Sequence, residues 1–205
     1  MSVTLSAPVP SPARAPRTPE APVHPQFVQR WSSRAFSSDP IDSETLRTLF
    51  EAARWAPSAS NAQPWLFVYA DEPEALERFR DLVKPSNRRW ADQAPVLLFL
   101  FSRRENKGEP NRCAQFDSGA AWMSFALEAN RLGLVTRAMG GIHHDRIHEA
   151  LSVPRDQYEI CCAIALGRRG RLEDLHPDLH EREWPSERRP LAEIARRGGY
   201  QPSSS

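Results

Sequence analysis

One segment, residues 114–132, restricts what this chain can fold into more than any other. Between Ala114 and Asn130 it carries only two charged residues, Asp117 and Glu128, and its apolar residues occur all round a helical circumference. A helix in a soluble protein that is apolar on every side has to be buried on every side. A chain of 205 residues has room for one sizeable core. We therefore predict a central helix that also lies at a subunit interface.

The rest of the chain from residue 26 onward reads as mixed helix and strand. Residues 96–101 are apolar at every position, which predicts a strand covered on both faces. Residues 41–55 predict a helix that Asp42 caps, with Ile41 packing against Leu46. Further predicted elements are a strand at 65–70, a helix capped by Asp71 that buries Leu76, Phe79, Leu82 and Val83, a strand at 134–138, a short helix at 145–151 and a strand at 158–166. We expect one α+β domain.

Proline divides the chain into regions. Seven of its 19 prolines fall within the first 25 residues, where large apolar side chains are few. Such a segment cannot offset the entropy cost of ordering its backbone. We predict a disordered tail at 1–25, a folded domain with a C-terminal arm at 26–195, and a flexible end at 196–205. After Gly167 the chain is polar with few core positions, so the arm is expected to wrap around a partner.

Composition excludes several classes of protein. The 27 basic and 26 acidic residues give a net charge of +1, so we expect no binding to nucleic acid. No apolar run reaches the roughly 18 residues that span a bilayer, so we expect no membrane partner. Three cysteines without CxxC spacing favour reduced thiols and a cytoplasmic location.

Two histidine pairs have the helical i, i+4 spacing that can bind a metal. They are His144 with His148 and His176 with His180. Neither pair has a set of further ligands nearby in the sequence, so we expect no metal site.

The first segment that can carry chemistry is Arg30-Trp-Ser-Ser-Arg-Ala-Phe36. It places two guanidinium groups on either side of two hydroxyls, just before a predicted helix. Arginine donates in a planar fork that suits phosphate, and serine adds donors without bulk. Taken alone, the segment is a weak signal that favours a solvated basic turn.

The second such segment is Ala56-Pro-Ser-Ala-Ser-Asn-Ala-Gln-Pro-Trp65, between a predicted helix and a predicted strand. Its small residues allow a ligand to approach the backbone closely, and its hydroxyls and amides offer both donors and acceptors. That combination suits the edge of a heteroaromatic ring. The alternative is an ordinary loop in which proline and asparagine form turns.

Together these segments resemble the FMN-dependent nitroreductase family. The resemblance covers roughly residues 26–195 and rests on short motifs in the family's order. The motifs are Arg-x-Ser-x-Arg-x-Phe36, Glu51-Ala-Ala-Arg-Trp-Ala-Pro-Ser58, Asn61-x-Gln-Pro-Trp65, Asp117-x-Gly-x-Ala, Leu132-Gly-Leu, Met139-Gly-Gly141, Ile164-x-Leu-Gly167 and Arg188-Arg-Pro-Leu191. One departure is Trp31, because family members often have a second basic residue there.

The resemblance implies an α+β fold with a nitroreductase-like central sheet of antiparallel type, flanked by helices, in an intertwined homodimer. It implies that two FMN molecules lie in clefts between the subunits. The implied phosphate ligands are Arg30, Ser32 and Arg188, while Arg34 is expected to face the N1–C2=O edge of the flavin. Pro57, Ser58, Ser60 and Asn61 are expected to reach the flavin from the other subunit, and Gly140 and Gly141 to present backbone N–H groups near N5 and O4. Phe125 or Trp122 is expected to line the substrate pocket, although aromatic residues on such a helix are more often simple core.

The implied activity is FMN-dependent ping-pong hydride transfer, from NAD(P)H through flavin N5 to a nitroaromatic, quinone or similar acceptor. No dinucleotide-binding GxGxxG motif is present in the sequence, which fits a nicotinamide that binds only in passing. No side chain is identified as a catalytic acid or base. Two alternatives stay open. One is an FMN-dependent biosynthetic dehydrogenase or oxidase that uses oxygen, and the other is a non-catalytic flavin-binding dimer.

Overall fold

Four antiparallel strands form the sheet at the centre of the fold, in the order β1-β2-β6-β5. This is the arrangement in a computed structural model of the chain, which describes residues 17–200. The strands are β1 (Trp65–Ala70), β2 (Val96–Arg103), β5 (Leu134–Met139) and β6 (Tyr158–Arg168). A two-stranded ribbon, β3 (Glu105–Asn106) with β4 (Glu109–Pro110), extends beyond β2.

Strand β2 shows why the sheet needs cover on both faces. All residues of β2 from Val96 to Ser102 are buried. Alternate side chains point to opposite faces of a strand, and Leu97, Phe99 and Phe101 join one hydrophobic cluster while Val96, Leu98 and Leu100 join the other. The predicted two-sided burial of this strand is confirmed.

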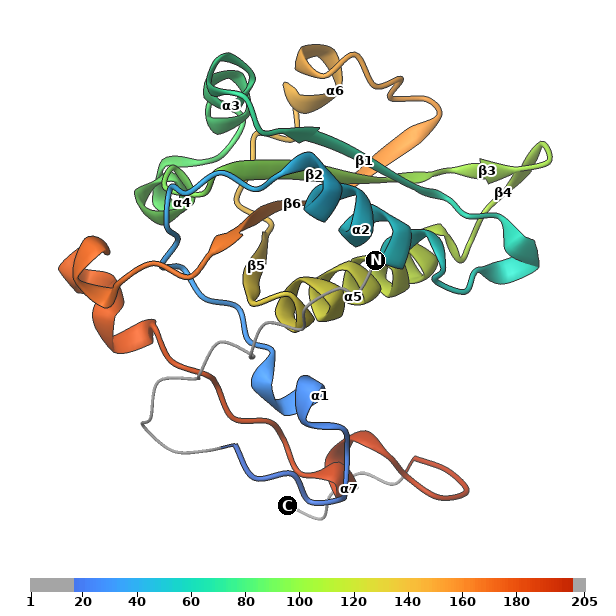
Figure 1. The fold of residues 1–205 in the computed structure, drawn as a ribbon. Helices are drawn as coiled ribbons and strands as arrows, with labels where there is room; N and C mark the ends of the chain where they lie inside the picture. Colours follow the sequence, from blue (N-terminus) through green and yellow to red (C-terminus); the bar gives the residue numbers. More distant parts are fainter. Residues whose placement is uncertain (1–16, 201–205) are drawn as a thin grey trace.

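Helices cover each face of the sheet (Figure 1). On one face lie α2 (Ser43–Arg54) and α5 (Ala114–Arg131), which contribute to one cluster. On the other lie α3 (Pro73–Arg80), α4 (Pro85–Ala91) and α6 (Ile147–Ala150), with the short turns η2 (Leu172–Asp174) and η3 (Pro177–Arg182) beside them. The fold is α+β, as predicted.

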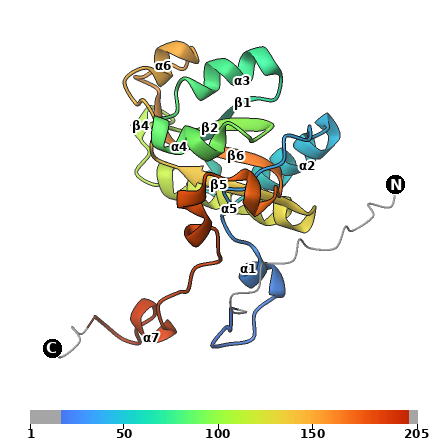
Figure 2. The same ribbon diagram turned by 90° about the vertical axis from the view of Figure 1, so that its left-hand side faces the viewer.

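The two ends of the described chain extend away from this body (Figure 2). They carry α1 (Pro25–Gln29) and α7 (Leu191–Ile194). Residues 17–25, which we assigned to the disordered tail, have defined contacts, because the Glu20 carboxylate accepts a hydrogen bond from the Leu191 N–H at 3.2 Å. The rest of the predicted tail, 1–16, and residues 201–205 of the predicted flexible end lie outside the described residues.

Several local predictions meet different outcomes. Asp42 caps α2 as predicted, since its carboxylate accepts from the Thr45 N–H at 2.7 Å. The predicted cap at Asp71 is wrong, because Pro73 begins α3 and the N-cap is Glu72. Proline is favoured at the first helical position.

Although polar, residues 172–183 are not a free arm, because Leu175 and Leu179 are buried in the chain's own core.

Helix α5 is not buried on every side within one chain. Phe125 and Ala129 are buried, whereas Phe116 is 82% exposed and Met123 is 37% exposed. One apolar face of the helix is therefore left uncovered.

Among residues 17–200, none of the helices combines the length and the apolarity that crossing a membrane would require.

Candidate functional site

The segment that follows α1 displays its polar side chains on one side. Trp31, Ser33 and Ala35 are buried, and the residues between them are only partly buried. The segment pairs with the end of β6, since Ser37 N–H donates to Arg168 O at 3.0 Å and Gly170 N–H donates to Ala35 O at 3.0 Å. In extended backbone, alternate residues share a face. The accessible face of this segment is formed by Arg30, Ser32 and Arg34.

Glu183, which we did not predict, holds this segment in place. Its carboxylate is 2% exposed and accepts from Ser33 Oγ at 2.5 Å and from the Ala35 N–H at 3.0 Å. Both of its oxygens accept from the Arg34 N–H, at 2.8 and 2.9 Å. A buried carboxylate with several donors is well compensated for the water it has lost. Glu183 therefore fixes the backbone that carries the candidate ligands.

The surroundings of Glu183 are rich in arginine. The Arg34 guanidinium lies 3.8 Å from Glu183 Oε2 and donates to the Arg182 carbonyl at 2.9 Å. The Arg137 guanidinium donates to the Ser32 carbonyl. Burial, followed by repulsion from Arg34 and Arg182, lowers the pKa of Arg137 to about 10 even though Glu183 acts in the opposite direction. Positive charge thus exceeds negative charge here, which favours an anionic or electron-rich ligand.

Arg30, Ser32 and Arg188 lie close together. Arg30 Nη1 is 3.4 Å from Ser32 Oγ. Burial, and then the nearby charge of Arg188, lower the pKa of Arg30. Within residues 17–200, Arg30 Nε is buried and has no hydrogen-bond acceptor. A buried guanidinium N–H without an acceptor fits an anion such as phosphate.

The loop after α2 has unusual backbone geometry. Ser60, Asn61 and Gln63 have positive φ values of 52°, 54° and 46°. Residues other than glycine rarely adopt this conformation, and it is concentrated at ligand-binding sites. The loop is fastened at two points, where Gln63 N–H donates to Ser58 Oγ at 3.0 Å and Ala59 N–H donates to Asp117 Oδ2 at 3.0 Å. Pro57, Ser60 and Asn61 remain exposed.

We refer to the stretch that carries Arg30, Ser32 and Arg34 as the arginine segment. Within one chain, this segment and the loop after α2 lie at opposite ends of α5. Asp117, in the first turn, holds the loop, whereas the carbonyl of Leu127, near the last turn, accepts from Gln26 Nε2 in α1 at 2.8 Å. Ten residues of helix separate these two anchors, a rise of roughly 15 Å. One copy of the chain does not bring the two groups of predicted ligands to the same place.

Gly140 and Gly141 follow β5, which is an edge strand of the sheet. The Gly141 carbonyl accepts from the Lys84 N–H at 2.9 Å and from Asn87 Nδ2 at 3.2 Å. A Cβ at position 141 would lie 2.4 Å from Asn87 Nδ2, so a larger residue would displace that amide. Gly140 is exposed, and nothing lies within 4 Å of where its Cβ would be. Its backbone is therefore open to a ligand.

The two aromatic residues predicted for the substrate pocket have different environments. Phe125 is fully buried, with its ring centroid 5.6 Å from that of Phe50 and 5.8 Å from that of Phe67. Trp122 is only partly buried and lies 6.3 Å from Phe125 between ring centroids. The structure thus places Phe125 in the core, and Trp122 is the one that retains surface for a ligand.

The histidines considered as metal ligands have local partners. Nδ1 of His148 lies 3.0 Å from the Val153 carbonyl, and Nε2 of His180 lies 3.0 Å from the Leu175 carbonyl. The described part of the chain contains no group of three or more His, Cys, Asp or Glu residues arranged to hold a metal ion.

Comparison with known proteins gives consistent matches. A model of the nitroreductase family matches residues 27–89 and 83–168. A crystal structure described as an oxidoreductase containing FMN is 44% identical, covers 91% of this chain and 97% of its own, and superposes with a TM-score of 0.88. The structure of a provisionally named nitroreductase from Desulfovibrio desulfuricans, in complex with FMN, is 26% identical over 89% of this chain and 100% of its own, with a TM-score of 0.70.

A relative from Rhodopseudomonas palustris (strain TIE-1) matches on sequence. It is provisionally named an NADH dehydrogenase/NAD(P)H nitroreductase. It is 27% identical over 174 residues, and the match covers 75% of this chain and 89% of the relative.

Proposed function

This chain belongs to the nitroreductase family, and we propose that it is an FMN-dependent oxidoreductase that takes a hydride from NADH or NADPH. We propose that the reducing equivalents pass to a nitroaromatic, quinone or similar small acceptor. The similar solved structures are described as containing FMN, and the relative's name points to a nicotinamide donor. The observation that carries the proposal is the arginine segment, with its three ligand-type side chains on one face and an unsatisfied buried N–H at Arg30.

When bound, FMN would supply the hydride chemistry, and the protein would bind and orient it. We assign the phosphate to Arg30, Ser32 and Arg188. We assign the N1–C2=O edge of the ring to Arg34, whose positive charge would favour the electron-rich reduced form. Glu183 keeps Arg34 in place by accepting the Arg34 backbone N–H. We assign the backbone N–H groups of Gly140 and Gly141 to N5 and O4 of the ring, where the open backbone at Gly140 would leave the N5 side accessible.

We propose that the remaining contacts come from a second copy of the chain. Pro57, Ser58, Ser60 and Asn61 lie at the far end of α5 from the arginine segment, so we assign them to the flavin bound by the other protomer. The uncovered apolar face of α5, with Phe116 at 82% exposed, is available for that second copy. A homodimer would bring the loop of one protomer to the arginines of its partner.

The same proposal includes a pocket and a location. Trp122 is the aromatic residue that we assign to the acceptor pocket, because Phe125 is enclosed by its own chain. All three cysteines are free thiols, which suits a reducing cytoplasm.

The test is a flavin titration of the purified chain, followed by anaerobic addition of each nicotinamide. We expect one FMN per chain and loss of the yellow absorbance on adding NADH or NADPH. A yellow protein that neither nicotinamide bleaches would overturn the reductase. Bleaching by an organic substrate with release of peroxide in air would favour the oxidase, and failure to bind FMN would overturn both.

A further inference from the structure

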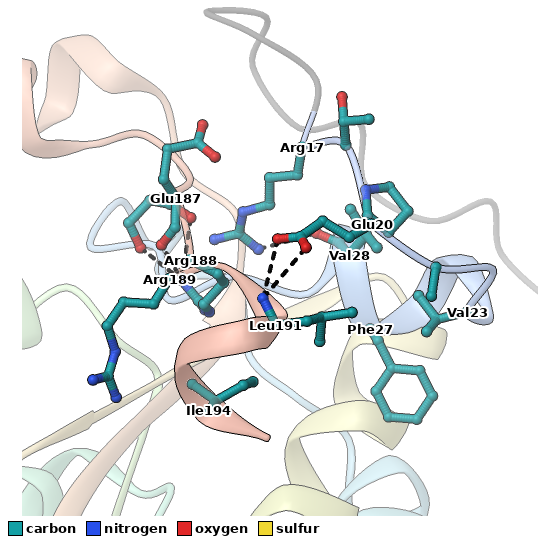
Figure 3. Close-up of a pocket in the computed structure, with 14 residues that line it drawn as sticks. Arg17, Glu20, Val23, Phe27, Val28, Glu187, Arg188, Arg189, Leu191 and Ile194 are labelled. Carbon is teal, nitrogen blue, oxygen red and sulfur yellow. Dashed lines mark hydrogen bonds between the residues drawn. The ribbon is translucent and has the colours of Figure 1, made fainter. Parts of the chain in front are cut away.

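Three arginines converge where the N-terminal segment runs beside the C-terminal arm. Arg17 Nη1 donates to the carbonyls of Val28 and Arg30, both at 3.0 Å. Arg17 and Arg188 line the same pocket, which has a volume of about 420 Å³ (Figure 3). We refer to Arg17, Arg30 and Arg188 as the arginine cluster. Its first member comes from the region that we assigned to a disordered tail.

The positive charge of the arginine cluster is poorly balanced. Burial, and then Arg188 and Arg30, lower the pKa of Arg17, with Glu187 acting in the opposite direction. No ion pair joins the cluster to a carboxylate in the part of the chain that the structure describes. The carboxylate of Glu20 is nearby, but it accepts from the Leu191 N–H (Figure 3). Like charges repel, and no carboxylate of the described residues pairs directly with these arginines, so the cluster suits a bound anion.

Arg17 has donors left for such an anion. A guanidinium has five N–H groups, and the two carbonyl contacts of Arg17 use only Nη1. Its Nε is buried and, among residues 17–200, has no acceptor, which is also the case for Nε of Arg30. Two neighbouring arginines whose Nε groups have no acceptor among the described residues suit an anion with several oxygens, because the guanidinium fork binds phosphate through two parallel N–H groups.

Position 31 adds no positive charge to this region. Trp31 is 6% exposed, and the Arg169 guanidinium lies over its ring. Arg169 Cζ is 5.2 Å from the centroid of the Trp31 ring. It therefore contributes packing and no charge to the segment that carries Arg30 and Ser32.

We propose that Arg17 is a further ligand of the FMN phosphate, beside Arg30 and Arg188. This inference rests on the proposed function. It makes the N-terminal segment part of the cofactor site.

The experiment compares the affinities of FMN and riboflavin for the full-length chain, because the two differ only in the phosphate. In Arg17→Ala, we expect FMN to bind about ten-fold to a hundred-fold more weakly, the range for losing a charge-assisted hydrogen bond. Riboflavin affinity should change less than about two-fold, within ordinary surface effects. Arg17→Lys keeps the positive charge but loses the planar fork, so its FMN affinity should lie between those of Arg17→Ala and the unaltered chain. Arg47→Ala removes the same charge from an exposed position on α2 and should bind both flavins as the unaltered chain does.

Other outcomes separate this inference from the proposed function. Equal FMN affinity in Arg17→Ala and the unaltered chain would overturn the inference alone. Equal weakening of FMN and riboflavin binding would also overturn it, because Arg17 would then act only by holding the backbone at Val28 and Arg30 in place. An unaltered chain that binds neither flavin would instead overturn the proposed function, and the phosphate ligand with it.

Discussion

Glu183 accepts the backbone N–H of Arg34 through both carboxylate oxygens, at 2.8 and 2.9 Å. Glu183 thereby fixes the position of Arg34, the residue that we assign to the flavin ring. Replacing Glu183 by Gln should lower the free energy of unfolding by roughly 3 kcal/mol, because it leaves buried donors and Arg34 without their counter-charge. Urea unfolding measures this. FMN affinity should fall as well.

The matched control is Glu181→Gln, two residues away and exposed. It removes the same charge from the same segment and should change neither stability nor FMN affinity measurably. If Glu183→Gln were as stable as this control, the carboxylate would not hold the segment.

Phe125 and Trp122 should respond differently to truncation. Phe125→Ala removes a fully buried ring and should cost about 3–5 kcal/mol of stability. Trp122→Ala should cost less stability and should raise KM for the acceptor, because we assign that ring to the pocket. Unfolding curves and steady-state kinetics on both variants distinguish these roles. A larger loss of stability in Trp122→Ala than in Phe125→Ala would contradict the assignment.

The uncovered face of α5 should hold the dimer together. Phe116→Glu places a charge on an apolar side chain that is 82% exposed within one chain. If a second copy covers it, burying that charge is costly, and sedimentation should report a monomer. Gln157→Glu adds the same charge at an exposed position directly before β6, and this variant should remain a dimer. A dimeric Phe116→Glu variant would show that the interface lies elsewhere.

The partly buried thiol of Cys162 should make stability depend on pH in the alkaline range. Burial raises the pKa of Cys162 to about 12, from an ordinary 9.0. The folded chain then keeps a proton that the unfolded chain loses, so this contribution to stability is complete below about pH 9 and declines as the pH rises toward 12. Cys162→Ala should show a shallower decline between about pH 9 and 11 in urea unfolding. Identical declines would mean that another group is responsible.

Elements with strong periodicity could be predicted from the sequence, and those without it could not. The apolar spacing in α2 and the unbroken apolar run in β2 each specify one type of structure. Helix α4 has only Trp90 and Ala91 to bury, too few for a recognisable pattern. Leu82 and Val83 are buried as expected, but they lie beyond the end of α3.

Part of the candidate site was predictable from residues adjacent in sequence, and the distant Arg188 only from the family resemblance. Arg30, Ser32 and Arg34 lie on one extended segment, so their common face follows from alternation. Glu183 contacts that segment from 149 residues away, and nothing in the sequence distinguishes it from Glu181. Arg17 lies among prolines, where composition favours disorder, and its role depends on where the C-terminal arm runs.

The most direct test of the central claim asks whether each cofactor site uses residues of two protomers. A chain with Arg30→Ala and a chain with Asn61→Ala are co-expressed with different tags, and the mixed dimer is purified through both. Each variant alone should bind FMN poorly. The mixed dimer should regain one FMN, because one of its two sites combines an unaltered arginine segment with an unaltered loop. A mixed dimer that binds FMN no better than either parent would contradict a site shared between protomers.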